Sequence, residues 1–199
     1  MQTDQTGNAA AMTLTTLLVP TYHQMLGALS AWLGKAQEQL GEGPADALMS
    51  ARLAPDMFPL ATQVRFACVQ ALEAVYRLTE QPFPQSITTL LDEGRGAAEA
   101  PGTIADAQAR IDETLSLLND LSPTALDIDP GAPIAHALPA GMIFDMTAGQ
   151  YARDWTLPQF YFHLMIAYAI LRANGVALGK ADYVAHMFPL LRPGTMPAA

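Results

Sequence analysis

Apolar residues recur at every third or fourth position in four long segments, which is the spacing of helices with a buried face. The first segment runs from about 14 to 40, and Pro20 either kinks this helix or marks where it becomes regular. The second follows Asp56, a candidate N-cap, and ends near Thr79. Its apolar stripe consists of Met57, Leu60, Val64, Cys68, Ala71, Val75 and Leu78.

The third and fourth segments carry recognisable helix-end signals. The third opens at Thr103, where "TIAD" is similar to a capping box with Asp in the place of Glu. The fourth is "FYFHLMIAYAILR", residues 160–172, which we expect to begin at Pro158 and to end at the "NG" of 174–175. Apolar and aromatic groups lie on both sides of this helix, so the pattern predicts burial nearly all round. Short helices are expected at "ITTLLDE" and within "VALGKADYVAHM".

The stretch between the third and fourth long helices has a different character. It reads "SPTALDIDPGAPIAHALPAGMIFDMTAGQYARDW" and is rich in Pro, Gly and Asp. Its segments "IAHAL" and "MIFDMT" are expected to pair as a small hairpin around "PAG". The sequence therefore predicts an all-α protein, a bundle of four long antiparallel helices in a single domain over 1–199, with this hairpin as an excursion.

Composition and charge narrow the class of protein. Apolar residues make up 51% of the chain and charged residues 15%, which excludes a disordered chain. The net charge is −9, so we expect no nucleic-acid partner, because such proteins must neutralise phosphates. High apolar content and ten methionines, which supply adaptable packing surface, predict a homodimer.

The cellular location follows from three features of the chain. The single cysteine, Cys68, excludes an internal disulfide and fits a reducing compartment. The first residues, "MQTDQTGNAAAMTL", lack the basic region and apolar core of a secretory signal. The longest apolar run contains His163, ends at Arg172 and is shorter than the roughly 20 residues that a membrane span needs. We therefore expect a cytoplasmic protein without a membrane partner.

His163 is the candidate that the sequence brings forward most clearly. A buried imidazole needs hydrogen-bond partners for its ring nitrogens, or it costs on the order of 1–3 kcal/mol. One interpretation is a core histidine bonded to a neighbouring group. The other is a polar pocket that binds a small-molecule ligand, lined by His163 with Gln63, Asp56 and His23. Gln63 and Gln70 lie at the edge of the second helix's stripe, where they either line a cleft or mark the solvent boundary.

Metal and nucleotide chemistry find little support in the motifs. A helical zinc site needs a second ligand at the HxxxH spacing, and position 167 is alanine. The other histidines, His23, His136 and His186, have no ligand spacing. The GxSxG, GxGxxG and P-loop patterns are absent from the sequence. We therefore expect no metal and no other cofactor, and whether the protein is an enzyme stays open.

Two long segments carry a family resemblance. "ARLAPDMFPLATQV" and "LPQFYFHLMIAYAILRANGVALGKADY" resemble the signature segments of the domain-of-unknown-function family DUF1993, and the order and spacing of nearly the whole chain are similar to that family. The resemblance implies a four-helix bundle of the DinB/YfiT-like type, a superfamily with metal-dependent enzymes of transferase or hydrolase type.

The resemblance also implies where a metal would be sought. In those relatives one histidine on the second helix and an HxxxH pair on the last helix bind the metal. Here Gln63 lies near the first position, His163 supplies one member of the pair, and Ala167 breaks the other. Two hypotheses remain: a binding or enzymatic bundle with a cleft at His163, or a non-catalytic bundle that acts by association with itself or a partner.

Overall fold

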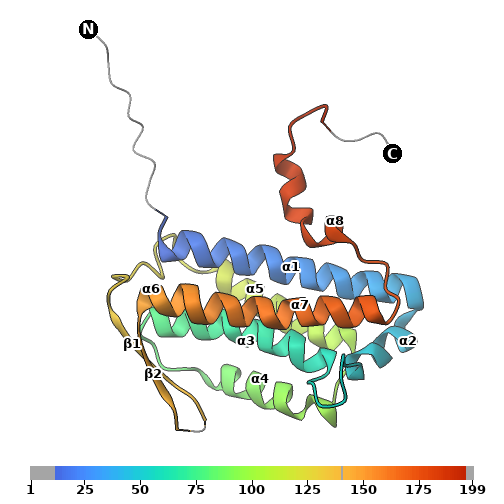
Figure 1. Cartoon of the computed structure of the whole chain (residues 1–199), viewed down its shortest axis with the longest axis horizontal. Coiled ribbons are helices and arrows are strands. Elements are labelled where there is room, and N and C mark those ends of the chain that lie inside the picture. The colour runs from blue at the N-terminus through green and yellow to red at the C-terminus, as the bar shows by residue number, and fades with distance from the viewer. Residues whose placement is uncertain (1–11, 140, 196–199) are drawn as a thin grey trace.

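Helices form most of the computed structural model, which describes residues 12–139 and 141–195 (Figure 1). A small antiparallel sheet of two strands projects at one end. The elements in chain order are α1 (Leu14–Leu40), α2 (Glu42–Ala47), η1 (Leu48–Ser50), α3 (Leu60–Leu78), α4 (Gln85–Arg95), η2 (Gly96–Ala98), α5 (Ile104–Asn119), β1 (Pro133–Ala137), β2 (Ile143–Thr147), α6 (Ala148–Gln150), η3 (Tyr151–Thr156), α7 (Leu157–Ala173), α8 (Lys180–Tyr183) and η4 (Ala185–Leu190).

Capping boxes begin two of the long helices. The Thr13 side chain accepts from the backbone N–H of Thr16 and thereby starts α1. Thr103 accepts in the same way from Asp106, whose carboxylate accepts from the Thr103 N–H, so the expected start of α5 is confirmed. Pro20 lies in the second turn of α1, and the helix begins before it rather than at it.

The start of α3 differs from the sequence prediction. Asp56 is not the N-cap; it lies exposed in the turn before the helix, and Pro59 occupies the capping position. The Leu60 N–H donates to the Ala51 carbonyl over 2.9 Å, so a contact with the preceding loop satisfies the first turn without a capping side chain.

The helix α4 is longer than expected and packs closely on α3. Its Gly94 lies against Phe66 of α3, where a Cβ atom would come within 2.4 Å of the Phe66 ring. The Thr62 hydroxyl donates to the Gly94 carbonyl over 2.7 Å. A side chain at position 94 would therefore displace Phe66, which packs on His163 in the site described below.

The last long helix begins ten residues earlier than Pro158. Thr147 and Gln150 form a capping box at α6, and the chain continues through the π-helical turn η3 directly into α7. Pro158 has no backbone N–H to donate, so the regular helical hydrogen-bond pattern is interrupted there, and the wide π-helical turn η3 lies just before this interruption. At the other end Gly175 has a φ of +84°, so the expected left-handed cap is confirmed.

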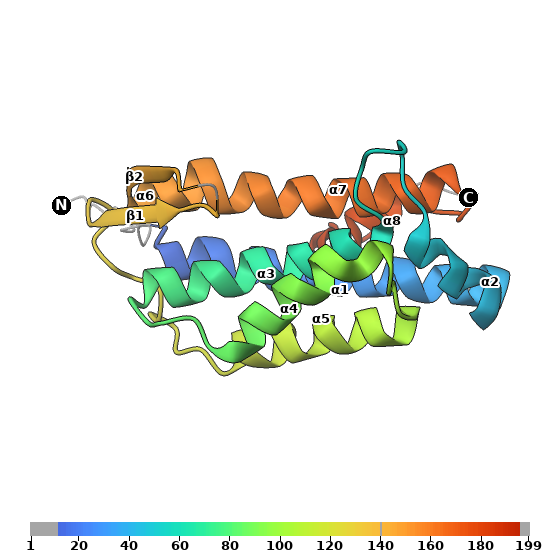
Figure 2. The same ribbon diagram turned by 90° about the horizontal axis from the view of Figure 1, so that it is seen from below.

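The four longest helices lie side by side but do not all alternate in direction (Figures 1 and 2). Helices α1 and α7 run the same way, as the contacts of Tyr22 with Thr156 and of Trp32 with Tyr168 show. Helices α3 and α5 run the opposite way. The expectation of four antiparallel helices is therefore wrong for successive α3 and α5, because α4 returns the chain between them.

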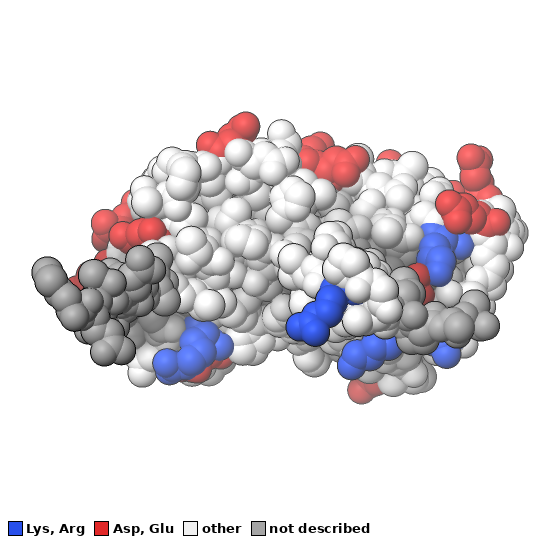
Figure 3. All heavy atoms as spheres, turned by 90° about the horizontal axis from the view of Figure 1, so that it is seen from above, with Lys and Arg blue, Asp and Glu red and all other residues white. Residues whose placement is uncertain are grey.

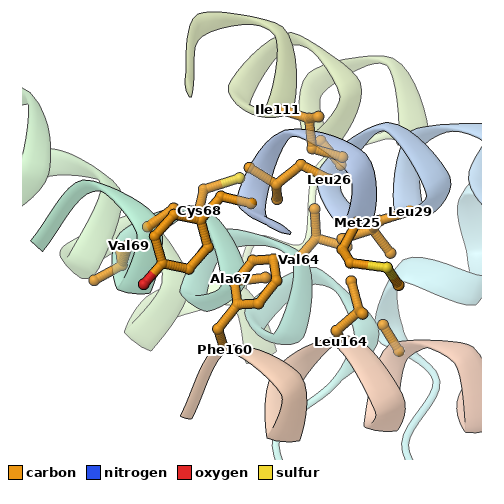
Figure 4. Packing of buried hydrophobic residues seen from close by; sticks show 14 of the residues in the cluster. Met25, Leu26, Leu29, Val64, Ala67, Cys68, Val69, Ile111, Phe160 and Leu164 are labelled. Carbon is orange, nitrogen blue, oxygen red and sulfur yellow. The ribbon is translucent and has the colours of Figure 1, made fainter. Parts of the chain in front are cut away.

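The core lies where these four helices meet (Figure 4). Close-packed apolar side chains from every long helix converge there, and their removal from water is the main force that holds the helices together. The core includes Met25, Leu26 and Leu29 of α1, Val64, Ala67 and Cys68 of α3, Ile111 of α5, and Phe160 and Leu164 of α7.

The predicted hairpin is confirmed. Strands β1 and β2 pair antiparallel from Pro133↔Thr147 to Ala137↔Ile143, and Gly141 in the connection has a φ of +81°. Strand β1 turns Ile134 and His136 inward and leaves its other residues exposed. The alternation shows that one face of β1 lies against the helices.

The surface shows where the helices are left uncovered. Phe162 and Met165 of α7 are 55% and 41% exposed, so the prediction that this helix is buried nearly all round is wrong for one face. On the side seen in Figure 3, neutral side chains cover most of the surface, and charged ones lie mainly towards its margins. Within the described part of the chain, no helix is both long and apolar enough to span a membrane.

Candidate functional site

His163 and Gln63 meet across the seam between α3 and α7. These helices run antiparallel, and Gln63 in the first turn of α3 lies opposite His163 near the middle of α7. His163 Nδ1 and Gln63 Oε1 are 2.9 Å apart. Both side chains are buried, with 9% of His163 and 2% of Gln63 exposed. Two residues that the sequence singled out 100 positions apart therefore form one hydrogen-bonded pair.

A second hydrogen bond of Gln63 fixes the tautomer of the imidazole. The Gln63 Nε2 amide donates to the Phe58 carbonyl over 3.1 Å, so Gln63 Oε1 must be the acceptor towards the ring. His163 therefore carries its proton on Nδ1, and Nε2 keeps a lone pair. Among the described residues no group hydrogen-bonds to Nε2. Nε2 is therefore an acceptor that no described group uses.

Aromatic rings surround this imidazole and keep it uncharged. The Phe66 and Phe162 rings stand edge-on to His163 at centroid distances of 5.3 and 5.4 Å, and Phe58 contacts Phe66 in the same manner at 5.8 Å. Burial lowers the pKa of His163 to about 4. The imidazole is neutral near pH 7, where it accepts a hydrogen bond well but is a weak base.

The other two predicted site residues do not join this pair. Asp56 is exposed in the loop before α3, and His23 is exposed on α1; neither makes a hydrogen bond to His163 or Gln63. Ala167, one turn beyond His163, is fully buried and brings no ligand atom. Within residues 12–139 and 141–195, no group of three or more His, Cys, Asp or Glu side chains is arranged to hold a metal ion.

A second polar region lies further along the same seam, towards the C-terminal end of α3. Gln70, Glu73 and Arg77 follow Gln63 at helical spacing and line a cavity of about 450 Å³ together with His136 of β1. Trp155 of η3 also borders this cavity. The hairpin thus closes one end of the α3–α7 seam with polar groups facing inward.

Several polar atoms of this second region lack partners. His136 is only 3% exposed, and neither ring nitrogen makes a hydrogen bond with the described residues. The same holds for Gln70 Oε1, Arg77 Nε and the Tyr151 hydroxyl. Burial, and to a smaller extent the charge of Arg77, lowers the pKa of His136 to about 4, and burial raises the pKa of Glu73 above its usual range. Unsatisfied buried groups of this kind are costly and call for an explanation.

Sequence reasoning missed most of this second region. His136 was weighed only as a metal ligand, and Glu73, Arg77 and Tyr151 were not singled out. One signal was present: positions 63, 70 and 77 carry polar side chains seven residues apart, within a helix whose neighbouring positions are apolar. The partners from the hairpin could not be inferred, because their docking depends on tertiary packing.

Comparison with known proteins agrees with this architecture. The sequence model of a family described as "Domain of unknown function (DUF1993)" matches residues 14–184. Among solved structures, a DinB family member protein from Shewanella denitrificans is similar, with a TM-score of 0.69 and 32% sequence identity over 92% of this chain and 96% of that chain. A search of curated proteins gives no match. The predicted resemblance to the DUF1993 family is thereby confirmed.

Proposed function

We propose that this chain, which belongs to the DUF1993 family, binds a small uncharged molecule beside His163. The observation that carries the proposal is the relay from the Phe58 carbonyl through the Gln63 amide to His163 Nδ1. This relay presents the Nε2 lone pair as a fixed hydrogen-bond acceptor. The ligand we infer carries a hydroxyl or N–H donor on an aromatic body that packs against Phe162.

The bundle supplies a rigid frame for such a site. We interpret the four long helices as a single-domain bundle of the DinB/YfiT-like type, supported by the similarity to the DinB family structure. Sites built on helices hold side-chain geometry better than sites on loops. Here the acceptor Gln63 comes from α3 and the donor His163 from α7, and Gly94 allows the close packing of α4 that positions Phe66.

The alternative function is a metal-dependent enzyme of the transferase or hydrolase type, with an incomplete metal site. Its support is the position of His163, which offers one imidazole nitrogen where DinB-like relatives place a metal ligand. One nitrogen is too few, because a catalytic zinc takes three protein ligands, and Gln63 and Ala167 bring no imidazole. Binding without a metal is therefore the function that the donor set supports better.

Nitrogen-detected NMR of the histidine rings tests the proposal directly. We expect His163 in the free protein to be protonated at Nδ1 only, because Gln63 accepts there. Phenol, an aromatic donor, should shift the Nε2 resonance saturably, whereas its methyl ether anisole should not. Equal responses to both compounds, or a proton on Nε2 in the free protein, would contradict the proposal.

Two variants and a metal titration complete this test. Gln63→Leu removes the acceptor, so His163 should become a mixture of tautomers and the phenol response should weaken. Arg172→Gln, an exposed change on the same helix, should leave the response unchanged. Zinc added to the wild type should not shift Nε2; saturable zinc binding that His163→Ala abolishes would establish the alternative instead.

We further propose that the protein forms a cytoplasmic homodimer. The exposed side chains of Phe162 and Met165 on α7, and of Met187 and Phe188 in η4, supply apolar area for such an interface. The single cysteine, buried in the core, supports a reducing compartment. Light scattering at tens of micromolar should report twice the mass of one chain, and a monomer there would refute the dimer.

A further inference from the structure

The cavity between α3, α4 and the β-hairpin is separate from the His163 pair and has its own chemistry. Gln70, Glu73 and Arg77 form one wall, and His136 with Leu138 forms another. In Figure 1 strands β1 and β2 lie at the end of the molecule where α3 finishes. We call this cavity the hairpin groove; its volume is about 450 Å³.

Glu73 and Arg77 line the hairpin groove without pairing, whereas Arg95, which also borders the groove, pairs with Asp92 over 3.4 Å. Among the described residues, Arg77 forms no ion pair, and Glu73 forms neither an ion pair nor a hydrogen bond, although they lie one helical turn apart on α3. The Arg77 guanidinium instead lies over the Phe83 ring, 4.8 Å from its centroid. A partly buried carboxylate and a guanidinium that do not satisfy each other are both available to a ligand.

Neutral hydrogen-bonding groups lie between these charges. His136 is buried to more than nine-tenths of its surface and borders the groove with both ring nitrogens unpartnered. Gln70 Oε1 is also a buried acceptor without a donor in the described structure. Native proteins leave few such groups without a partner, so their gathering in one groove indicates that something else satisfies them.

Apolar surface completes the lining. The Trp155 ring lies 4.4 Å from the His136 ring between centroids, and Phe83, Leu91 and Leu138 also border the groove. Ligand sites commonly combine an apolar wall with a few placed polar groups. A ligand that fits needs an apolar portion as well as polar ends.

We propose that the hairpin groove binds a small aminocarboxylate with an apolar side chain. Arg77 holds the carboxylate, since its planar fork matches two carboxylate oxygens, and Glu73 holds the ammonium group. Gln70 Oε1 accepts a further N–H, and the side chain packs on Trp155. A ligand with one charge alone would cover the groove and leave the opposite protein charge desolvated and unpaired, which is costly.

Fluorescence of Trp155 measures this binding with phenylalanine as the probe. Trp32 is the second tryptophan of the chain and is fully buried, so Trp32→Phe leaves Trp155 as the only reporter. We expect phenylalanine to change the emission saturably. Phenethylamine, which lacks the carboxylate, and 3-phenylpropionate, which lacks the amine, should each bind at least tenfold more weakly, since a lost charged hydrogen bond is worth a factor of about 10 to 100.

Matched variants assign the two ends of the ligand. Glu73→Gln is isosteric and should weaken phenylalanine about tenfold or more, but it should strengthen 3-phenylpropionate, because that ligand then leaves no buried carboxylate unpaired. Arg77→Gln should weaken both carboxylates and strengthen phenethylamine, because no guanidinium is then left unpaired beside that ligand. Arg172→Gln, far from the groove on the exposed side of α7, controls for a general loss of positive charge. Circular dichroism of each variant confirms that it remains folded.

Three outcomes would overturn the proposal. Phenylalanine and leucine could both fail to bind up to their solubility limits. Phenylalanine and 3-phenylpropionate could bind equally, in which case the ammonium contributes nothing. Glu73→Gln could leave phenylalanine affinity unchanged. None of these results bears on the phenol response of His163, so failure here is distinguishable from failure of the proposed function.

Discussion

Replacing His163 by alanine tests whether this residue is held as the structure shows. The change removes a ring that is 91% buried between Phe66 and Phe162 and leaves Gln63 Oε1 without its donor. The lost packing and the stranded acceptor together should lower the free energy of unfolding by roughly 2–4 kcal/mol. A hydrated cleft would give less than about 1 kcal/mol, as surface substitutions do.

A double-mutant cycle separates the packing from the hydrogen bond. Gln63→Leu strands His163 Nδ1–H in the same way that His163→Ala strands Gln63 Oε1. In the double variant neither group is stranded towards the other, so its cost should fall short of the sum of the single costs by about 1–3 kcal/mol. A purely additive result would mean that the pair contributes no mutual stabilisation.

Urea unfolding followed by circular dichroism supplies the measurement, with unchanged slopes as the condition for comparing midpoints. Phe162→Ala is the matched control, because it removes a neighbouring ring that is 55% exposed and makes no hydrogen bond. We expect the control to cost less than His163→Ala. Equal losses of under about 1 kcal/mol for both would refute the interpretation of His163 as a buried, bonded residue.

Two further predictions concern titrating groups. The pKa of His163 is lowered from 6.5 to about 4 in the folded protein, so the contribution of the neutral imidazole to the free energy of unfolding is complete above pH 6.5 and is lost as the pH falls towards 4. The difference in free energy of unfolding between wild type and His163→Ala should therefore shrink by up to about 3 kcal/mol over this window. A constant difference would contradict the lowered pKa. Burial raises the pKa of Cys68 to about 12, so iodoacetamide at pH 8 should label this thiol only in urea, and rapid labelling of the native protein would refute its burial.

The long helices could be predicted because their signals are local. The apolar period and the Thr103 capping box fix α5, and the αL glycine at 175 ends α7. The hairpin was predictable for the same reason, since alternating short segments flank a turn. The local signals misplaced the start of α3, because Asp56 has a capping side chain but the first turn is satisfied by a hydrogen bond from Leu60 to the Ala51 carbonyl of the preceding loop.

The two residues of the candidate site could be predicted from the sequence, but the hydrogen bond between them could not. Gln63 and His163 stand out as polar residues within apolar stripes, which identifies them without an alignment. Their pairing depends on the antiparallel approach of α3 and α7, which no local pattern specifies. The sequence prediction places the start of the last helix at Pro158, but the capping signal lies earlier, in "TAGQ".

The two ends of the α3–α7 seam differ in how far the protein satisfies its own polar groups. At His163 the Phe58 carbonyl, the Gln63 amide and the imidazole Nδ1 are linked by two hydrogen bonds. These groups satisfy one another, and only the acceptor Nε2 has no partner among the described residues. In the hairpin groove, no described residue hydrogen-bonds to either nitrogen of His136, and none forms an ion pair with Glu73 or Arg77. Leaving buried groups unpaired costs stability, and evolution tolerates that cost chiefly at functional sites. Ligand binding should therefore stabilise the groove more than the His163 pair, because there it replaces missing interactions rather than adding one to a satisfied relay.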